Sequence, residues 1–217
     1  MPHPVEVFFS FRSPYCYLLT GRLTGLAARF DVEVTIRPVY PIAVRNADFF
    51  KRVDPLYRPY HLQDSARVAE RLNIPYRRPV PDPIVQDLET GVIAEEQPYI
   101  RYITRMAQAA ADRGEALAYS AAVMTLLWNG ATDNWHEGEY LANACRAAGV
   151  DFVALDRSAR DEAKGLDVKI EDNQNSQRAA GHWGVPLMVF NGEPFYGQDR
   201  FDTLCWRLTQ QGLANSD

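Results

Sequence analysis

Long apolar runs, paired cysteines and blocks of basic residues are all missing from this sequence. No run reaches the roughly 18 apolar residues of a membrane-spanning helix, and no basic, apolar leader opens the chain. The three cysteines stand far apart, which argues against a disulfide framework or a metal site and fits a reducing compartment. The net charge is −5 with scattered arginines, which excludes a nucleic-acid footprint. We therefore expect a cytoplasmic protein that binds no membrane, nucleic acid or metal.

The first forty residues predict a strand, a helix and a second strand. Residues 5–10 are apolar, β-branched or aromatic, as in a short buried strand. Ser13 and Pro14 then form a helix start, because a serine oxygen caps a free backbone N–H and proline has a preset φ. Apolar side chains recur at helical spacing as far as Phe30, and residues 32–36 alternate as a strand. The order is that of a βαβ unit.

The middle of the chain, from about residue 41 to residue 181, predicts helices and no strand. Gly149 stands where a helix often ends on a residue with positive φ. The segments with helical periodicity are residues 62–72, 95–113, 115–129 and 137–148, and residues 177–181 close a further short helix.

The last forty residues predict a hairpin followed by a helix. Residues 187–190 are apolar, and Asn191-Gly192 is the pair that type I′ turns prefer, since both residues need positive φ. Residues 194–196 supply the partner strand, and Asp199 is the expected N-cap of the closing helix.

A βαβ opening, a helical middle and a ββα ending predict an α/β protein with a thioredoxin-like fold. Neither end has enough strands to bury a sheet alone, so we expect both ends to share one sheet. The thioredoxin-like domain then comprises residues 1–44 and 176–217, and residues 45–175 form an inserted all-helical domain.

The junction between the first strand and the first helix carries the chemical signal. A redox thioredoxin has two cysteines there, because a helix N-terminus lowers a thiol pKa. This chain has Ser13 at the first position and Cys16 at the second. Since a hydroxyl forms no disulfide, two-cysteine redox cycling is excluded. The remaining site, with free N–H groups and a hydroxyl, suits a thiolate that belongs to another molecule.

A second signal is Val185-Pro186, directly before the hairpin. A cis peptide bond here would present the Val185 backbone as an unpaired edge. An extended peptide can pair with such an edge by strand addition.

These segments resemble a known family. Residues 9–18 (FSFRSPYCYL), residues 184–186 (GVP) and residues 197–200 (GQDR) resemble the 2-hydroxychromene-2-carboxylate isomerase and kappa-class glutathione transferase group of the DsbA-like thioredoxin superfamily. Asp64, Arg67 and Ala69 look like a further family pattern. The resemblance extends over nearly the whole chain.

The resemblance implies glutathione as the cofactor and a role for five residues. Ser13 matches the serine that holds the glutathione sulfur as thiolate. Val185 matches the residue whose backbone pairs with the cysteinyl part, and Pro186 matches the cis-proline. Asp199, with Gln198 beside it, matches the contact to the γ-glutamyl end, where a carboxylate meets an ammonium group. A homodimer is also implied.

The chain departs from the family in two places, and several residues have simpler interpretations. Cys16 replaces a residue that is commonly small, and Arg45-Asn46 stands where the family has a lysine and an asparagine. Ser13 and Asp199 can be helix caps alone. Cys16 can be a buried hydrophobic residue, and Arg12 and Arg45 can be surface arginines. Trp128, Trp135 and Trp183 are interpreted as packing residues. Five residues can either line an aromatic-substrate pocket or pack in the core: Phe49, Phe50, Tyr57, Tyr60 and His61.

The leading hypothesis is a glutathione-dependent isomerase of an aromatic hydroxy- or keto-carboxylate. The first alternative is a kappa-like glutathione transferase or peroxidase, which would consume glutathione. The second is a DsbA-like thiol–disulfide oxidoreductase that uses the single Cys16. The third is a binding module without catalysis.

Overall fold

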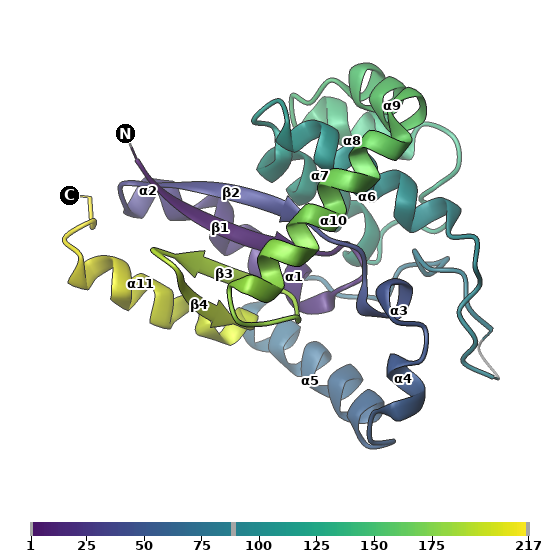
Figure 1. Ribbon diagram of the computed structural model, residues 1–217, viewed down its shortest axis with the longest axis horizontal. Helices are drawn as coiled ribbons and strands as arrows, with labels where there is room; N and C mark the ends of the chain where they lie inside the picture. The colour runs from purple at the N-terminus through teal and green to yellow at the C-terminus, as the bar shows by residue number, and fades with distance from the viewer. Residues whose placement is uncertain (1, 88–89, 216–217) are drawn as a thin grey trace.

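The computed structural model describes residues 2–87 and 90–215 and is built around one four-stranded sheet (Figure 1). The strand order is β2-β1-β3-β4, with β1 parallel to β2 and antiparallel to β3. The two ends of the chain therefore share one sheet, and the predicted thioredoxin-like α/β fold is confirmed. The strands are β1 (His3–Phe9), β2 (Val32–Pro38), β3 (Leu187–Phe190) and β4 (Glu193–Tyr196).

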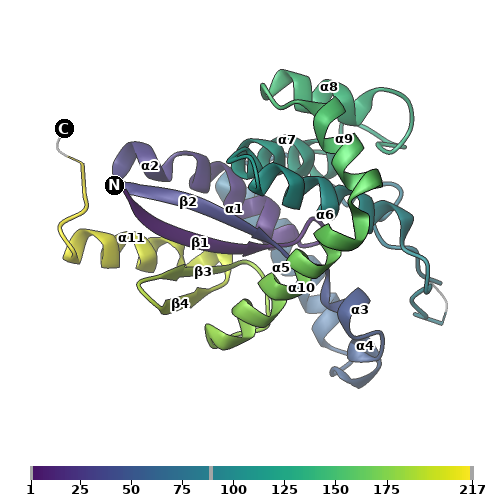
Figure 2. The ribbon, with the colours of Figure 1, turned by 45° about the horizontal axis from the view of Figure 1, so that its top comes forward.

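Helices cover both faces of the sheet (Figures 1 and 2). Because neighbouring strand residues point to opposite faces, Phe8 and Leu187 pack with Ala180 at the end of α10 (Ala163–Ala179). Val7 and Met188 face the main core on the other side. That core includes α1 (Pro14–Thr24), α2 (Leu26–Arg29) and α11 (Phe201–Gln210).

Two local predictions are confirmed by backbone geometry. Ser13 is the N-cap of α1, with Pro14 at the first helical position. Asn191 and Gly192 have φ values of 50° and 78°, as a type I′ turn requires.

The middle of the chain is helical, and each of the four periodic segments overlaps a helix, although the helix Tyr57–Leu72 begins before the predicted segment 62–72. The buried positions of α10 explain why only its last turn was predicted. They are Leu166, Ile170, Asn173 and Gln177, and two of these are polar, so the apolar periodicity is weak. Helices of four residues are too short to show an apolar periodicity, so the sequence does not predict them. It does not predict the ten-residue α9 either. The helices are α3 (Ile42–Arg45), α4 (Phe49–Arg52), α5 (Tyr57–Leu72), α6 (Pro98–Ala111), α7 (Ala116–Trp128), α8 (Tyr140–Ala147) and α9 (Phe152–Asp161).

Two helix boundaries differ from the prediction. The first helix is interrupted at Gly25, between α1 and α2. Asp199 is not the N-cap of the closing helix: Gly197, with φ of 102°, starts a 3₁₀ turn, η1 (Gln198–Arg200), and α11 begins only after it. In the part of the chain that the structure describes, no helix combines the length and apolarity of a membrane span.

Candidate active-site cleft

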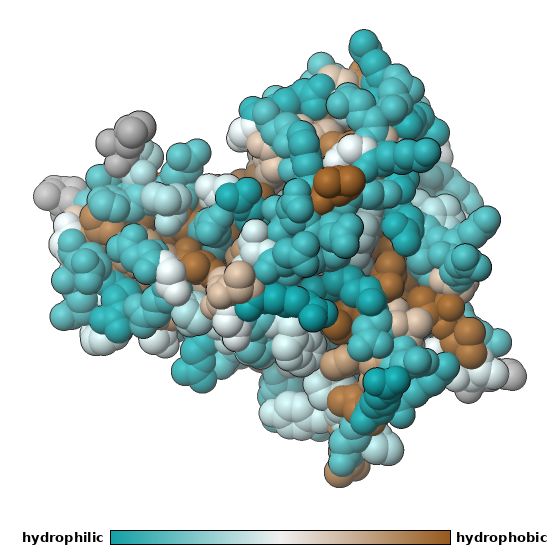
Figure 3. Space-filling view, viewed as in Figure 1, coloured by the Kyte–Doolittle hydropathy of each residue, from teal (hydrophilic) through white to brown (hydrophobic). Residues whose placement is uncertain are grey.

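A cleft of about 420 Å³ opens where the thioredoxin-like sheet meets the helical middle of the chain. It lies between the N-terminus of α1, the segment before β3, and the helices α3 to α5. On the face shown in Figure 3, which is mostly hydrophilic, apolar side chains gather beside α3 and the loop that precedes α6. The cleft is lined by side chains from both ends and from the middle of the chain, among them Ser13, Arg12, Tyr15, Arg45, Tyr57, His61, Asp82, Trp183, Val185 and Tyr196.

Ser13 is partly buried at the N-terminus of α1 and faces the cleft. Its Oγ accepts a hydrogen bond from the Cys16 N–H at 3.3 Å, and its own N–H donates to the Ser10 carbonyl at 3.1 Å. The first turn of α1 carries no acidic side chain. Pro14 has no N–H and the Cys16 N–H is already used, so it is the hydroxyl and the positive end of the helix dipole that suit a bound anion.

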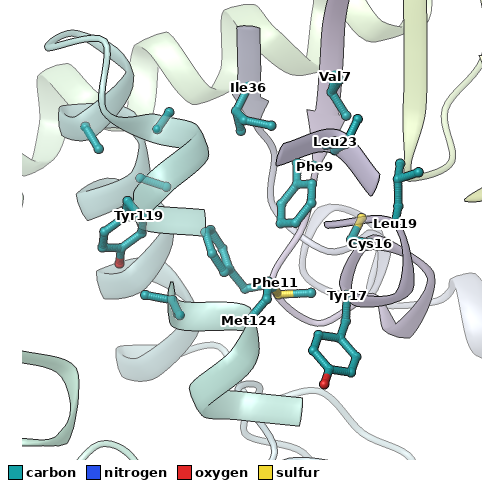
Figure 4. Close-up of a cluster of buried hydrophobic side chains, with 14 of the residues drawn as sticks. Val7, Phe9, Phe11, Cys16, Tyr17, Leu19, Leu23, Ile36, Tyr119 and Met124 are labelled. Carbon is teal, nitrogen blue, oxygen red and sulfur yellow. The ribbon is translucent and has the colours of Figure 1, made fainter. Parts of the chain in front are cut away.

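Cys16 is fully buried and does not line the cleft. Figure 4 shows its sulfur in the core near Phe9 and Leu19. Burial raises the pKa of the Cys16 thiol to about 12, although the Ser10 N–H and Ser13 act against this shift. The interpretation of Cys16 as a buried hydrophobe is confirmed, because the thiolate is absent at neutral pH and the sulfur has no access to a substrate.

The Val185–Pro186 peptide bond is cis, and Val185 lines the same cleft as Ser13. The neighbouring carbonyls are engaged: Gln177 donates to Gly184 at 2.7 Å, and the Gly197 N–H donates to Pro186 at 2.9 Å. The Val185 N–H and carbonyl have no hydrogen-bond partner among residues 2–87 and 90–215. An extended chain in the cleft can pair with this edge.

Gln198 and Asp199 lie beside the cleft and do not line it. Gln198 is buried, and its Oε1 accepts a hydrogen bond from Arg22. The Asp199 carboxylate is exposed and pairs with Arg200 at 3.1 Å. Asp199 stands close enough to Tyr196 of the cleft to contribute to its raised pKa, of which burial is the main cause.

The expectation that Arg12 is a surface arginine is wrong. Its side chain is only 17% exposed and forms a bidentate ion pair with Asp82, at 3.0 and 3.2 Å. Arg78 donates to the same carboxylate at 3.0 Å. Asp82 follows a second cis bond, Val80–Pro81, and lies between two prolines. The prolines of this segment predict a loop, but the sequence does not predict the ion pairs that Asp82 makes.

Trp183 and Arg45 also differ from their simpler interpretations. Trp183 packs against Phe49, with ring centroids 5.1 Å apart, yet it stays 42% exposed and lines the cleft. Arg45 is half-buried in the cleft wall.

Aromatic side chains of α5 form the wall opposite the sheet. Tyr57 and His61 line the cleft, as does Phe50 of α4, whereas Tyr60 points to solvent. The His61 and Tyr15 rings pack edge to face, with their centroids 4.9 Å apart. Burial lowers the pKa of His61, and nearby arginines lower it further, so the imidazole is neutral at neutral pH.

Tyr15 joins α1 to α5. Its hydroxyl donates to Asp64 at 2.6 Å, and Asp64 lies 3.7 Å from the Arg67 guanidinium. The hydrogen bond from Tyr15 to Asp64 therefore ties the α5 wall to the Ser13 helix, and Arg67 is an ion-pair partner of Asp64 within α5. The sequence suggested both residues as a family pattern but gave no physical role for them.

The sheet order, the cis-proline and the helix N-terminus beside it define a thioredoxin-fold protein with inserted helices. The chain belongs to the DSBA-like thioredoxin domain family, which matches residues 4–209.

Several solved structures share this fold. A 2-hydroxychromene-2-carboxylate isomerase is 22% identical with a TM-score of 0.66, over 96% of this chain and 97% of the other. A probable DsbA oxidoreductase from Streptomyces coelicolor is 18% identical with a TM-score of 0.65, over 96% and 89%. The cytosolic disulfide reductase DsbM from Pseudomonas aeruginosa, solved with GSH, is 15% identical with a TM-score of 0.61, over 97% and 100%. No curated protein matches this chain. At these identities the likeness establishes the fold.

Proposed function

We propose that the protein is a glutathione-dependent isomerase of an aromatic hydroxy- or keto-carboxylate. The observation that carries the proposal is that the Ser13 hydroxyl, at the N-terminus of α1, opens on the same cleft as the unpaired backbone of Val185. The first group suits a thiolate, and the second suits the backbone of a short extended peptide. Glutathione combines both features in one molecule.

The residues present fit glutathione in four respects. Ser13 donates a hydrogen bond to the sulfur, Val185 pairs with the cysteinyl backbone, and Pro186 keeps the Val185 edge turned toward the cleft. Asp199, whose carboxylate is exposed and pairs with Arg200, offers an acceptor near Tyr196 for the γ-glutamyl ammonium group. When bound, glutathione supplies a nucleophile that adds to a conjugated carbon, permits rotation about the resulting single bond, and leaves again.

The fold is shared with a 2-hydroxychromene-2-carboxylate isomerase and with a disulfide reductase solved with GSH, which is consistent with this proposal. The aromatic wall of α5 and the positive charges of the cleft suit a second substrate that is aromatic and anionic.

Turnover with a 2-hydroxychromene-2-carboxylate tests the proposal. We expect isomerisation that requires glutathione and leaves its concentration unchanged. Ser13→Ala should abolish most of the activity, whereas Cys16→Ala should retain it, because the Cys16 sulfur is buried. Loss of activity in Cys16→Ala with retention in Ser13→Ala would contradict the proposal.

A kappa-like glutathione transferase uses the same cleft and the same thiolate, so it remains the second candidate. Depletion of glutathione during turnover identifies it. The oxidoreductase alternative is disfavoured by the buried Cys16 thiol and its raised pKa. A binding module without catalysis predicts no turnover, and calorimetry without glutathione binding would favour it.

A further inference from the structure

His61 is the one histidine among the described residues that line the cleft. The rings of Tyr15 and Tyr57 hold its imidazole in place, with ring centroids 4.9 and 5.7 Å away. Among residues 2–87 and 90–215, neither imidazole nitrogen has a hydrogen-bond partner, and neither is sealed off from solvent. Both nitrogens are therefore free to contact a molecule in the cleft.

The neighbours of Ser13 in the sequence place His61 close to the start of α1. Tyr15 packs against the imidazole, and the Arg12 charge is near enough to lower the pKa of His61. Ser13 lies between these two residues in the chain and lines the same cleft. A sulfur held by Ser13 would therefore lie near the imidazole.

The other groups of the cleft are poorer proton acceptors at neutral pH. Asp82 is held by two arginines, and Asp54 is exposed and accepts the Leu56 N–H at 2.8 Å. A carboxylate is also a much weaker base than an imidazole, whose ordinary pKa is about 6.5. The tyrosines that line the cleft keep their hydroxyl protons, because burial raises their pKa values.

The surroundings of His61 keep it neutral until an anion arrives. Burial lowers its pKa most, Arg12 and Arg78 lower it further, and Asp64 acts in the opposite direction. A thiolate in the cleft would place an opposite charge beside the imidazole and would favour its protonated form. A neutral imidazole beside a thiol can then become an imidazolium beside a thiolate.

We propose that His61 is a catalytic base that takes the thiol proton of bound glutathione. The sulfur–hydrogen bond breaks and leaves its electron pair on sulfur, and the proton binds an imidazole nitrogen that faces the cleft. No further reactant is needed. The assignment rests on the proposed function, because Ser13 holds the sulfur while His61 holds the proton and returns it when glutathione leaves.

Nuclear magnetic resonance of the imidazole nitrogens of the intact wild-type protein tests the proposal at neutral pH. The signals of His61 are identified by their loss in His61→Gln. Glutathione should convert His61 to the imidazolium form. S-methylglutathione has no thiol proton to give, so it should leave His61 neutral.

The ultraviolet absorbance of the bound thiolate gives a second measurement. His61→Gln keeps a polar side chain that cannot take a proton, so the pKa of the bound thiol should rise by about one unit or more, a tenfold loss of thiolate per unit. The matched control is His136→Gln, which replaces a half-buried histidine of a separate cavity in the helical middle. Its bound thiol should titrate like that of wild type.

The outcomes separate this proposal from the proposed function. A neutral His61 beside bound thiolate overturns the proposal alone, as does an imidazolium that also forms with S-methylglutathione. A bound thiol that titrates in His61→Gln as in wild type overturns it too. Imidazolium formation without isomerase turnover refutes the proposed function and supports this role, and absence of glutathione binding to wild type overturns both. The wild-type spectra decide even where His61→Gln does not fold, because contact with the Tyr15 ring then identifies the His61 signals.

Discussion

Asp82 is the shared counter-ion of two cleft arginines, and Asp82→Ala tests how much the cleft depends on it. Its Oδ1 lies 3.0 Å from the Arg12 Nε and accepts the Ile84 N–H, while its Oδ2 accepts from Arg12 and Arg78. Removal of the carboxylate leaves both guanidinium groups without an acid. Arg12 also directly precedes Ser13, so the unpaired charge of Arg12 would lie beside the N-terminus of α1.

The expected destabilisation follows from the burial of this pair. The side chains of Arg12 and Asp82 are 17% and 20% exposed, so this ion pair is neither fully exposed nor fully buried. Exposed ion pairs contribute at most about 1 kcal/mol, and removal of one partner of a fully buried pair costs about 3–5 kcal/mol. We expect a loss of about 2–3 kcal/mol in unfolding free energy, between those limits. For a chain of this length, that loss corresponds to a fall in Tm of about 4–12 °C.

Thermal melts of two variants give the comparison. Asp133→Ala removes an exposed ion pair with Arg77 in the neighbouring loop and should lower the stability by about 1 kcal/mol or less. In the double variant Arg12→Met with Asp82→Ala, part of the loss should be recovered, since one unpaired charge is gone. The reasoning is refuted if Asp82→Ala melts within error of Asp133→Ala.

Two further substitutions test the cleft. Ser13→Cys restores the two-cysteine pattern with Cys16. Oxidation of this variant should therefore remove two titratable thiols, and the variant should reduce insulin. An unchanged number of titratable thiols after oxidation would contradict this prediction. Gly184→Ala places a Cβ about 2.5 Å from the Tyr196 ring and should cost about 1–3 kcal/mol in denaturant unfolding. Gly165→Ala, within α10 and with no atom within 4 Å of the added Cβ, should be neutral or stabilising, and equal effects at both glycines would contradict the packing.

Features governed by neighbouring residues were predictable from the sequence. The Ser13 cap and the Asn191-Gly192 turn each follow from the backbone preferences of two or three residues. The pairing of the two chain ends in one sheet follows from the element order, because a βαβ opening and a ββα ending complete each other.

Features that depend on distant contacts were not predictable. Arg12 meets Asp82 across 70 residues, and Arg45 meets Gln177 across 132, so nothing near either arginine in the sequence shows its burial. The Asp199 cap failed for a local reason: Gly197 adopts a positive φ and starts a 3₁₀ turn, which moves the helix start past the aspartate. A glycine adopts a positive φ about as readily as a negative one, so the sequence alone does not predict which of the two Gly197 has.

The central claim is tested most directly by the pKa of the thiol of bound glutathione. This pKa is measured from the ultraviolet absorbance of the thiolate as a function of pH. In wild type we predict a pKa clearly below the value of about 8.5 for a free thiol, and in Ser13→Ala a return toward that value. Cys16→Ala should titrate like wild type, because the pKa of its own thiol is raised to about 12. A bound thiol that titrates like free glutathione, or one whose lowered pKa survives in Ser13→Ala, would contradict the account.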